Sequence, residues 1–268
     1  MKLIEMTWPE VKEFAETTVA LWPLAATEQH GPHLSVSTDE AIVTRLCQRV
    51  EETAPNDVVL CPTLPYGASH HHLSFAGTMS LSADTLTAVI VELVKSLVSS
   101  GFRRIILLNG HGGNITPARQ ALSLLSHALD GRVTPNIALA TYWELAGQAF
   151  CGEPPMESPA LSHACEYETS LMLHLFPQRV HLERARRAKR PARNGYIGWE
   201  DDEPYRGVSV FKKTEYLSSN GSSGEPQLAT SAKGELLYQQ ATHALSQFVA
   251  QFKVWPLMKD LRGQDIQS

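Results

Sequence analysis

An apolar run that ends in glycine and histidine decides the fold of this chain: Ile105-Ile106-Leu107-Leu108-Asn109-Gly110-His111-Gly112-Gly113-Asn114. Its first part, residues 105–108, is continuously apolar, and we expect a strand over residues 104–108, of the kind found at the centre of a parallel sheet. A similar run, residues 19–24, leads into Glu28 and His30 and then into Asp39. Ligands of open α/β sheets gather at the carboxyl ends of the strands. We therefore expect these polar side chains to meet at one edge of a sheet.

Strand and helix patterns alternate around these two runs. Further strands are expected over residues 58–64 and 136–141, with one short strand at 208–211 in an otherwise loop-rich segment, 191–230. Helical spacing of apolar residues, with capping residues at the ends, predicts helices over 8–16, 39–49, 81–100, 117–129, 168–176 and 232–252. This alternation predicts one α/β domain over residues 1–268, with a mostly parallel sheet and helices on both faces.

The composition restricts the possible partners. The 268 residues are 43% hydrophobic and carry a net charge of −5, and the basic segment 184–190 is too short to offset that charge. A nucleic-acid backbone is therefore not expected as a partner. No apolar run spans eighteen residues, and the N-terminus lacks an apolar signal core, so no membrane partner is expected. The four cysteines show no C-x-x-C spacing, as in a reduced, cytoplasmic protein.

The polar residues at the strand ends have the pattern of a metal site. Glu28 and His30 are two apart, so both side chains leave one face of an extended segment. Gly31 and Pro32 then turn the chain, and Asp39 could bridge two ions while it caps a helix. Mixed carboxylate and imidazole ligands suit Zn²⁺, Mn²⁺ or Fe²⁺ better than Ca²⁺.

Two divalent ions and a bridging hydroxide would be neutralised by three carboxylates, so a further acidic ligand is expected. The segment His163-Ala164-Cys165-Glu166-Tyr167-Glu168-Thr169-Ser170 offers two candidates, Glu166 and Glu168. The residues Glu28, His30 and Asp39 also have plain structural explanations. Glu28 could be a charge in a loop, His30 a surface imidazole, and Asp39 only a helix cap. The glycines around His111 could form a phosphate-binding turn, but the G-x-G-x-x-G spacing is missing. Because Glu28, His30, Asp39 and His111 all fall at or after predicted strand ends, which chance would rarely produce, we favour the metal site.

Several motifs resemble those of the creatininase family of amidohydrolases, in the same order along the chain. The resemblance covers roughly residues 3–185 and the helix start at 231–235. The matching segments are Ala26-Thr27-Glu28-Gln29-His30-Gly31-Pro32-His33, Thr38-Asp39, Tyr66-Gly67-Ala68-Ser69-His70-His71-His72, Phe75-Ala76-Gly77-Thr78, Asn109-Gly110-His111-Gly112-Gly113-Asn114 and Glu168-Thr169-Ser170-Leu171-Met172-Leu173.

The resemblance implies a three-layer α/β sandwich, a homohexamer, and two divalent metal ions per subunit, with zinc expected first and manganese or iron as alternatives. By this analogy Glu28 and His111 hold one ion, His30 holds the other, and Asp39 bridges them. The implied activity is a metal-dependent hydrolase of non-peptide C–N bonds. Its substrate would be a small molecule, namely a cyclic amide, a formamide or a small peptide-like amide.

Two departures from creatininase itself matter for the site. Gly112 and Gly113 stand where creatininase has a tyrosine and a metal-ligating glutamate, so the missing ligand must come from elsewhere. We expect Glu168 rather than Glu166, with Glu166 near the site as a base or alternative ligand. Trp143 matches one of two tryptophans that enclose creatinine, but the other aligns near Pro159. Creatinine is therefore not the expected substrate.

The resemblance also implies roles around the substrate. His163 matches the proposed proton donor to the leaving nitrogen, although it could instead order its loop. His72, Trp143, Gly112 and Ser69 are expected to contact substrate; Trp143 could equally be core packing, and one or two of the histidines 70–72, His72 above all, should line the pocket. His33 is expected behind the ligands.

Two alternatives differ in chemistry. A serine or cysteine nucleophile would need a suitable partner, but the chain has no G-x-S-x-G elbow, and Cys165 lies too close along the chain to His163 for a productive pair. The other alternative is a non-catalytic small-molecule-binding protein on the same scaffold. Metal content would separate it from the hydrolase.

Overall fold

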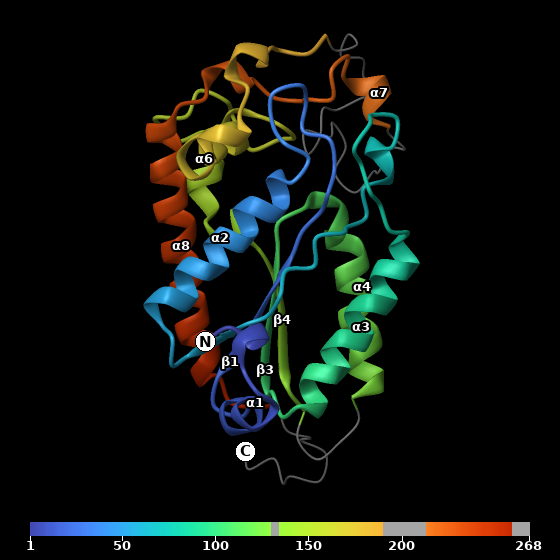
Figure 1. The fold of residues 1–268 in the computed structure, drawn as a ribbon, viewed down its shortest axis with the longest axis vertical. Helices are drawn as coiled ribbons and strands as arrows, with labels where there is room; N and C mark the ends of the chain where they lie inside the picture. The colour runs from blue at the N-terminus through green and yellow to red at the C-terminus, as the bar shows by residue number, and fades with distance from the viewer. Residues whose placement is uncertain (130–133, 190–212, 259–268) are drawn as a thin grey trace, which may run out of the picture.

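A four-stranded parallel sheet forms the centre of the molecule (Figure 1). The computed structural model describes residues 1–129, 134–189 and 213–258. The strands are β1 (Val19–Leu24), β2 (Val58–Leu60), β3 (Arg104–Asn109) and β4 (Asn136–Thr141), in the order β2-β1-β3-β4. As expected, the apolar strand β3 is internal, pairing with β1 and β4. The short strand predicted at 208–211 lies outside the described residues.

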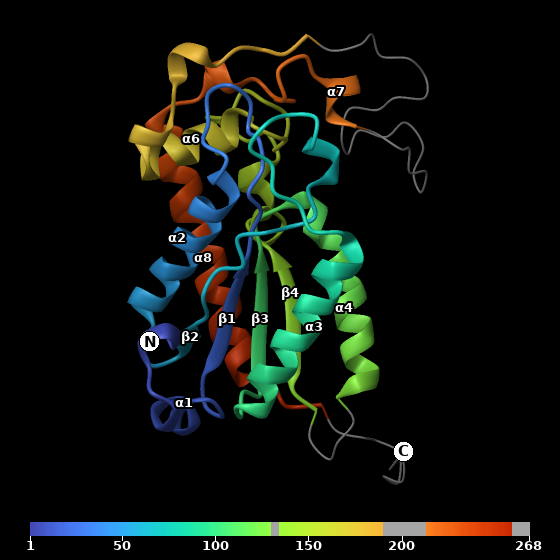
Figure 2. The same cartoon turned by 45° about the vertical axis from the view of Figure 1, so that its right-hand side comes forward.

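Helices cover both faces of the sheet, so the predicted three-layer α/β architecture is confirmed. One face carries α2 (Thr38–Thr53) and α8 (Ser231–Val254), and the other carries α3 (Ala83–Ser99) and α4 (Ile115–Ala128) (Figure 2). Helix α6 (Glu166–Leu175) packs against α8 and α2 beyond the carboxyl ends of the strands. Side chains of β3 alternate between the two layers: Ile106 and Leu108 pack in the core under α2 and α8, whereas Ile105 and Leu107 pack in the core under α3 and α4.

Shorter helices complete the described chain. They are α1 (Trp8–Phe14), α5 (Tyr142–Leu145) and α7 (Thr214–Leu217), with 3₁₀ turns at Leu3–Glu5, His70–His72, Gly112–Asn114, Gly147–Phe150, Pro177–Arg179, Leu182–Arg184 and Pro226–Leu228. None of the helices in the described part of the chain is both long enough and apolar enough to span a bilayer.

Capping residues explain where α3 and α8 begin. The hydroxyl of Ser82 accepts a hydrogen bond from the Thr85 N–H, which starts α3 two residues later than predicted. Thr230 caps α8 in the same way. The strand predicted over 58–64 already ends at Leu60. The helix predicted from Glu168 begins at Glu166, so both glutamates occupy its first turn.

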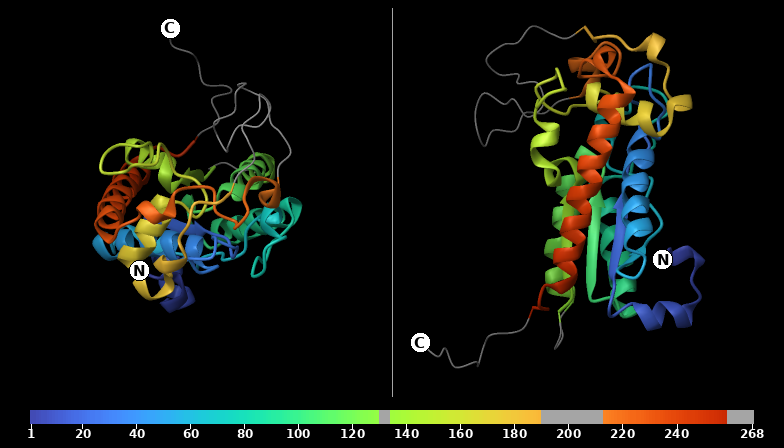
Figure 3. Two further views of the ribbon diagram at one scale, coloured as in Figure 1. Left: turned by 90° about the horizontal axis from the view of Figure 1, so that it is seen from above. Right: turned by 90° about the vertical axis from the view of Figure 1, so that its left-hand side faces the viewer.

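The carboxyl ends of β1 and β3 bring the two polar stretches together. Leu24 and Asn109, the last residues of these strands, are register partners, and the Gly110 N–H donates to the Leu24 carbonyl. At Gly110 a Cβ would lie 2.7 Å from the Val43 Cβ, so only glycine lets the β3 end pass this close to α2. Viewed from the side, α2 and α8 run beside each other along the sheet, and the loops that follow the strands cluster at its carboxyl edge (Figure 3).

Candidate metal centre

Asp39 lies between two histidines. It sits in the first turn of α2, and its Oδ1 is 3.1 Å from the His30 Nε2, while its Oδ2 is 3.2 Å from the His111 Nδ1. The three residues come from the segment after β1, from α2 and from the end of β3, and all are buried. Each carboxylate oxygen therefore faces a different imidazole, which is the arrangement a bridging ligand requires.

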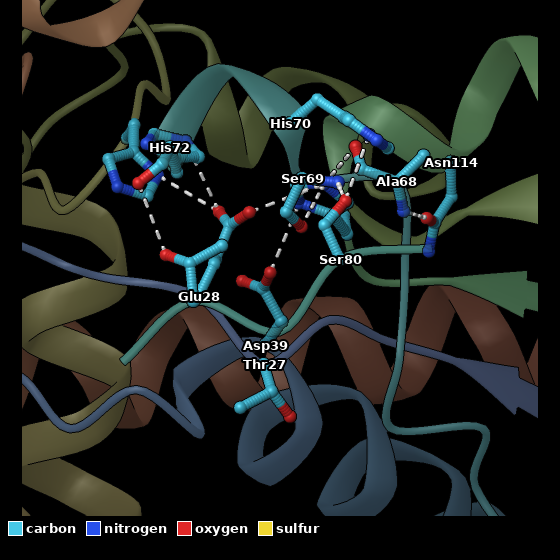
Figure 4. Close-up of polar contacts among 12 residues, drawn as sticks. Thr27, Glu28, Asp39, Ala68, Ser69, His70, His72, Ser80 and Asn114 are labelled. Carbon is cyan, nitrogen blue, oxygen red and sulfur yellow. Dashed lines mark hydrogen bonds and ion pairs between the residues drawn. The ribbon is translucent and has the colours of Figure 1, made fainter. Parts of the chain in front are cut away.

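Glu28 forms the second buried carboxylate of the cluster (Figure 4). Its Oε2 lies 3.4 Å from the His111 Nε2. Its Oε1 lies 3.4 Å from the His72 Nε2 and 3.4 Å from the His163 Nδ1. Glu28 thus faces His111 with one oxygen and two further imidazoles with the other.

The buried ligand atoms fit a divalent cation. Within the described residues, the Oε2 of Glu28, the Nε2 of His30 and the Oδ2 of Asp39 are buried without any hydrogen bond, although buried polar atoms normally have a partner. One ligand atom each from Glu28, His30 and Asp39 lies within 4.8 Å of the others, and the same holds for His30, His163 and Glu168. Cations at these positions would satisfy all three unpaired atoms.

The pKa values of the metal-free cluster also indicate a site for cations. Burial alone would lower the pKa of His30 and His111, but Asp39 raises that of His30 to about 10, and Glu28 and Asp39 raise that of His111 to about 9. Burial raises the pKa of Glu168 to about 8. Protons on these groups balance the buried carboxylates, and metal ions would displace these protons on binding.

The two glutamates of α6 have different surroundings. The Glu168 Oε1 lies 4.0 Å from the His30 Nε2, and the Ala164 N–H donates to its other oxygen. Glu166 instead accepts from Lys233 Nζ at 2.6 Å and from the Ser158 N–H at 2.7 Å. The expectation that Glu166 stays near the site as a base or alternative ligand is therefore corrected. Residues two apart on a helix point about 200° away from each other, so the Glu166 carboxylate is directed toward α8, away from the cluster.

The three consecutive histidines form a 3₁₀ turn. His72 is buried and lines the cavity above the cluster, as predicted, and His71 lines it too. The His71 ring stacks on that of His111 at 5.9 Å, and its nitrogen is close enough to Glu28 and His111 for all three to hold one ion. Two of the three histidines therefore line the cavity, within the one or two that we expected, but the residue pattern does not single out His71.

A cavity of about 620 Å³ opens above the cluster. Its described lining includes Trp143 and Gly112, which we expect to contact substrate, and His163, the expected proton donor; it also includes Phe150 and Leu161. Trp143 also packs against the core, so the core packing that we considered is observed, while its contact with substrate stays a prediction.

Ser69 does not meet the expectation of a substrate contact. It is fully buried, and its hydroxyl lies 3.2 Å from the His111 Nε2, on the edge of the imidazole rather than on the cavity surface. His33, as expected, lies behind the ligands, with its Nε2 3.0 Å from the Thr169 hydroxyl. Both residues therefore support the cluster from outside the cavity.

The two glycines after His111 differ in their surroundings, which gives a matched pair of variants. A Cβ at Gly113 would lie 2.1 Å from the Ala68 carbonyl oxygen and 2.6 Å from the His111 Nε2, whereas a Cβ at Gly112 would meet nothing within 4 Å. We expect Gly113→Ala to displace His111 and to weaken zinc binding by about 10- to 100-fold, the usual cost of disturbing a ligand's support. Gly112→Ala should bind zinc like the wild type in calorimetric titrations. Equal affinities for the two variants would contradict this geometry.

Comparisons with known proteins agree with one another. A family model described as "Creatininase: Creatinine amidohydrolase" matches residues 4–249. The chain is 33% identical over 224 residues to a mycofactocin precursor peptide peptidase of Mycobacterium tuberculosis (strain CDC 1551 / Oshkosh), covering 81% of this chain and 78% of that protein. It is 31% identical over 199 residues to a creatinine amidohydrolase of Pseudomonas putida, covering 67% and 74%.

Solved structures show the same likeness. A crystal structure of creatinine amidohydrolase superimposes with a TM-score of 0.78 at 26% identity, covering 95% of this chain and 98% of that one. A structure described as "Creatininase Mn" gives a TM-score of 0.75 at 26% identity, covering 93% and 97%. A mutant creatininase described as "Zn-Zn type" gives the same TM-score, identity and coverage.

Proposed function

Because this chain belongs to the creatininase family, we propose that it is a metal-dependent amidohydrolase that cleaves a C–N amide bond of a small substrate with water. The observation that carries the proposal is the set of buried, unpaired ligand atoms on Glu28, His30 and Asp39. They lie beneath a cavity large enough for a small organic molecule.

We assign the ligands to two ions. Glu28 and His111 would hold the first, His30 and Glu168 would hold the second, and Asp39, which contacts both histidines, would be shared between them. The donor set of carboxylates and imidazoles suits zinc, with manganese or iron as alternatives. Two of the similar creatininase structures are likewise described as Zn-Zn and Mn forms.

The side chains of the cavity supply the rest of the chemistry. Bound divalent ions would lower the pKa of a water molecule and polarise the amide oxygen. His163 reaches the cavity, with its Nδ1 directed toward Glu28, and is placed to carry a proton to the leaving nitrogen. Trp143, Phe150 and Leu161 form an apolar wall that would exclude bulk water from the reacting bond.

The substrate class includes cyclic amides, formamides and small peptide-like amides. Gly112 lines the cavity and has open space where a Cβ would stand, so it leaves room for substituents on the substrate. One similar protein is named a peptide peptidase and another a creatinine amidohydrolase, so a substrate panel should include both peptides and non-peptide amides. By resemblance we further propose a homohexamer of single-domain subunits, located in the cytoplasm.

The first test is the metal content of protein purified without chelator, measured by inductively coupled plasma mass spectrometry. We expect about two equivalents of zinc, manganese or iron per chain. Removal with a chelator should abolish hydrolysis across the amide panel, and the same metal should restore it. A chain that binds no metal after reconstitution, yet binds small molecules without turnover, would instead be a non-catalytic binding protein.

A further inference from the structure

The side-chain amide of Gln29 has only one orientation that satisfies its neighbours. Gln29 is buried, and its Oε1 lies 2.9 Å from the Gly31 backbone nitrogen, which can only donate. Its Nε2 lies 2.9 Å from the Gly221 carbonyl oxygen, which can only accept. Amide orientation must be assigned from such partners, and here two backbone groups fix it independently. The Nε2 group is therefore a donor toward everything that it touches.

That donor determines the tautomer of His72. The Gln29 Nε2 lies 2.7 Å from the His72 Nδ1, so the Nδ1 must accept and carries no proton. A neutral His72 then has its proton on Nε2, the nitrogen that lies 3.4 Å from the Glu28 Oε1. The Thr214 hydroxyl, 3.0 Å from the same Nδ1, can donate or accept and does not decide between the tautomers.

The main-chain carbonyl of Gln29 sets the opposite tautomer in His163. This carbonyl lies 2.8 Å from the His163 Nε2 and can only accept, so the Nε2 carries the proton. The Gln29 Nε2 also lies 3.0 Å from the His163 Nε2, but its two hydrogens are already directed to Gly221 and His72. A neutral His163 therefore presents a bare Nδ1 at 3.4 Å from the Glu28 Oε1.

We propose that Gln29 is a positioning residue that fixes opposite tautomers in His72 and His163, through its side-chain amide and its main-chain carbonyl respectively. The two rings stack with centroids 4.1 Å apart, and the nitrogens that face the Glu28 carboxylate are an N–H in one ring and a lone pair in the other.

The consequence for the reaction rests on the proposed hydrolase. His72 offers a hydrogen bond to an oxygen of the substrate and is not a metal ligand, although it lies within coordinating distance of Glu28 and His163. His163 offers the lone pair that must first accept a proton before it can deliver one to the leaving nitrogen. His72 and His163 thus have different functions, as hydrogen-bond donor and proton carrier, because Gln29 contacts both rings.

The loop that carries Gly221 closes over Gln29 and depends on glycine there. Gly221 has a φ of +87°, and a Cβ would lie 2.0 Å from the Gln29 Oε1. Gly221→Ala should therefore displace the amide without changing any side chain of the cluster. This variant provides a second way to disturb the network from outside it.

The test is ¹⁵N NMR of the histidine side chains, which reports which ring nitrogen carries the proton. The protein is loaded with Zn²⁺, because its filled d shell makes it diamagnetic and leaves the signals of nearby histidines visible. The His72 signals are identified by their loss in His72→Gln. In the wild type we expect an unprotonated Nδ1 and a protonated Nε2 on His72. Gln29→Glu keeps the side-chain shape but replaces the donor with an acceptor, so the His72 Nδ1 should become protonated. Thr214→Val, the matched control, should leave the wild-type tautomer.

Several outcomes would overturn the proposal. One is a wild-type His72 that carries its proton on Nδ1 or binds zinc through Nε2. Another is an unchanged tautomer in Gln29→Glu, or a changed one in Thr214→Val. If Gln29→Glu does not fold, the wild-type spectrum and the Gly221→Ala variant still test the proposal. In Gly221→Ala the fixed tautomer of His72 should be lost. If the chain neither holds zinc nor hydrolyses amides, the same tautomers remain measurable in the metal-free protein, so failure of the proposed function is distinguishable.

Discussion

Replacing Asp39 by asparagine is expected to remove nearly all bound metal and all hydrolysis. Asparagine keeps the size of the side chain but loses the charge and one of the two oxygens that face His30 and His111. Even residues that only support metal ligands contribute about 10- to 100-fold to affinity or activity, so loss of a bridging ligand should exceed about 100-fold in both. Metal stoichiometry after dialysis and turnover on the responsive amide measure the two effects.

Glu40→Gln is the matched control for this prediction. Glu40 follows Asp39 in the same turn of α2, and its replacement also removes one negative charge, but its carboxylate contacts Thr44 rather than the cluster. The control variant should bind two equivalents of metal and keep its activity. If Asp39→Asn behaved in the same way as Glu40→Gln, Asp39 would not bridge two ions, and the dinuclear assignment would be wrong.

The parts of the fold that depend on local sequence could be predicted. The apolar run of β3 and the alternating helices required a parallel sheet covered on both faces, and the parallel order placed Glu28, Asp39 and His111 at one edge. Those residues met because strand ends in such sheets converge whatever the intervening sequence. The family motifs added Glu168 and His163, which also lie at the cluster.

The details that depend on packing between distant segments could not be predicted. Glu166 and Glu168 are two apart, and the pattern alone treats them alike. The choice between them depends on Lys233, which lies 65 residues beyond Glu168 and binds Glu166 on the far side of the helix. Ser69 falls behind His111, and His71 enters the cavity, because residues 70–72 form a 3₁₀ turn. The contact of Gln29 with Gly221 likewise joins segments far apart in the sequence.

The two glutamates of α6 give the second large expected effect, because each substitution should damage a different property. Glu168→Gln should bind about one metal ion instead of two and lose more than about 100-fold in activity, since His30 loses its partner at the second ion. Its fold should not suffer. The folded-state pKa of Glu168 is raised to about 8, above its usual value of 4.5. Stability of the metal-free protein therefore falls as pH rises between these values, and glutamine removes that loss.

Glu166→Gln should show the opposite pattern. Its carboxylate pairs with the buried Lys233 at 2.6 Å, and breaking a buried pair from one side leaves an uncompensated charge. Glu157 stays beside Lys233 at 3.0 Å and offsets part of the loss, so we expect destabilisation by about 2–4 kcal/mol. Folded Glu166→Gln should still bind two metal ions. Denaturant unfolding of both metal-free variants, compared with their metal content, separates the two roles. A Glu166→Gln protein that lost one ion while keeping full stability would reverse the assignment and make Glu166 the ligand.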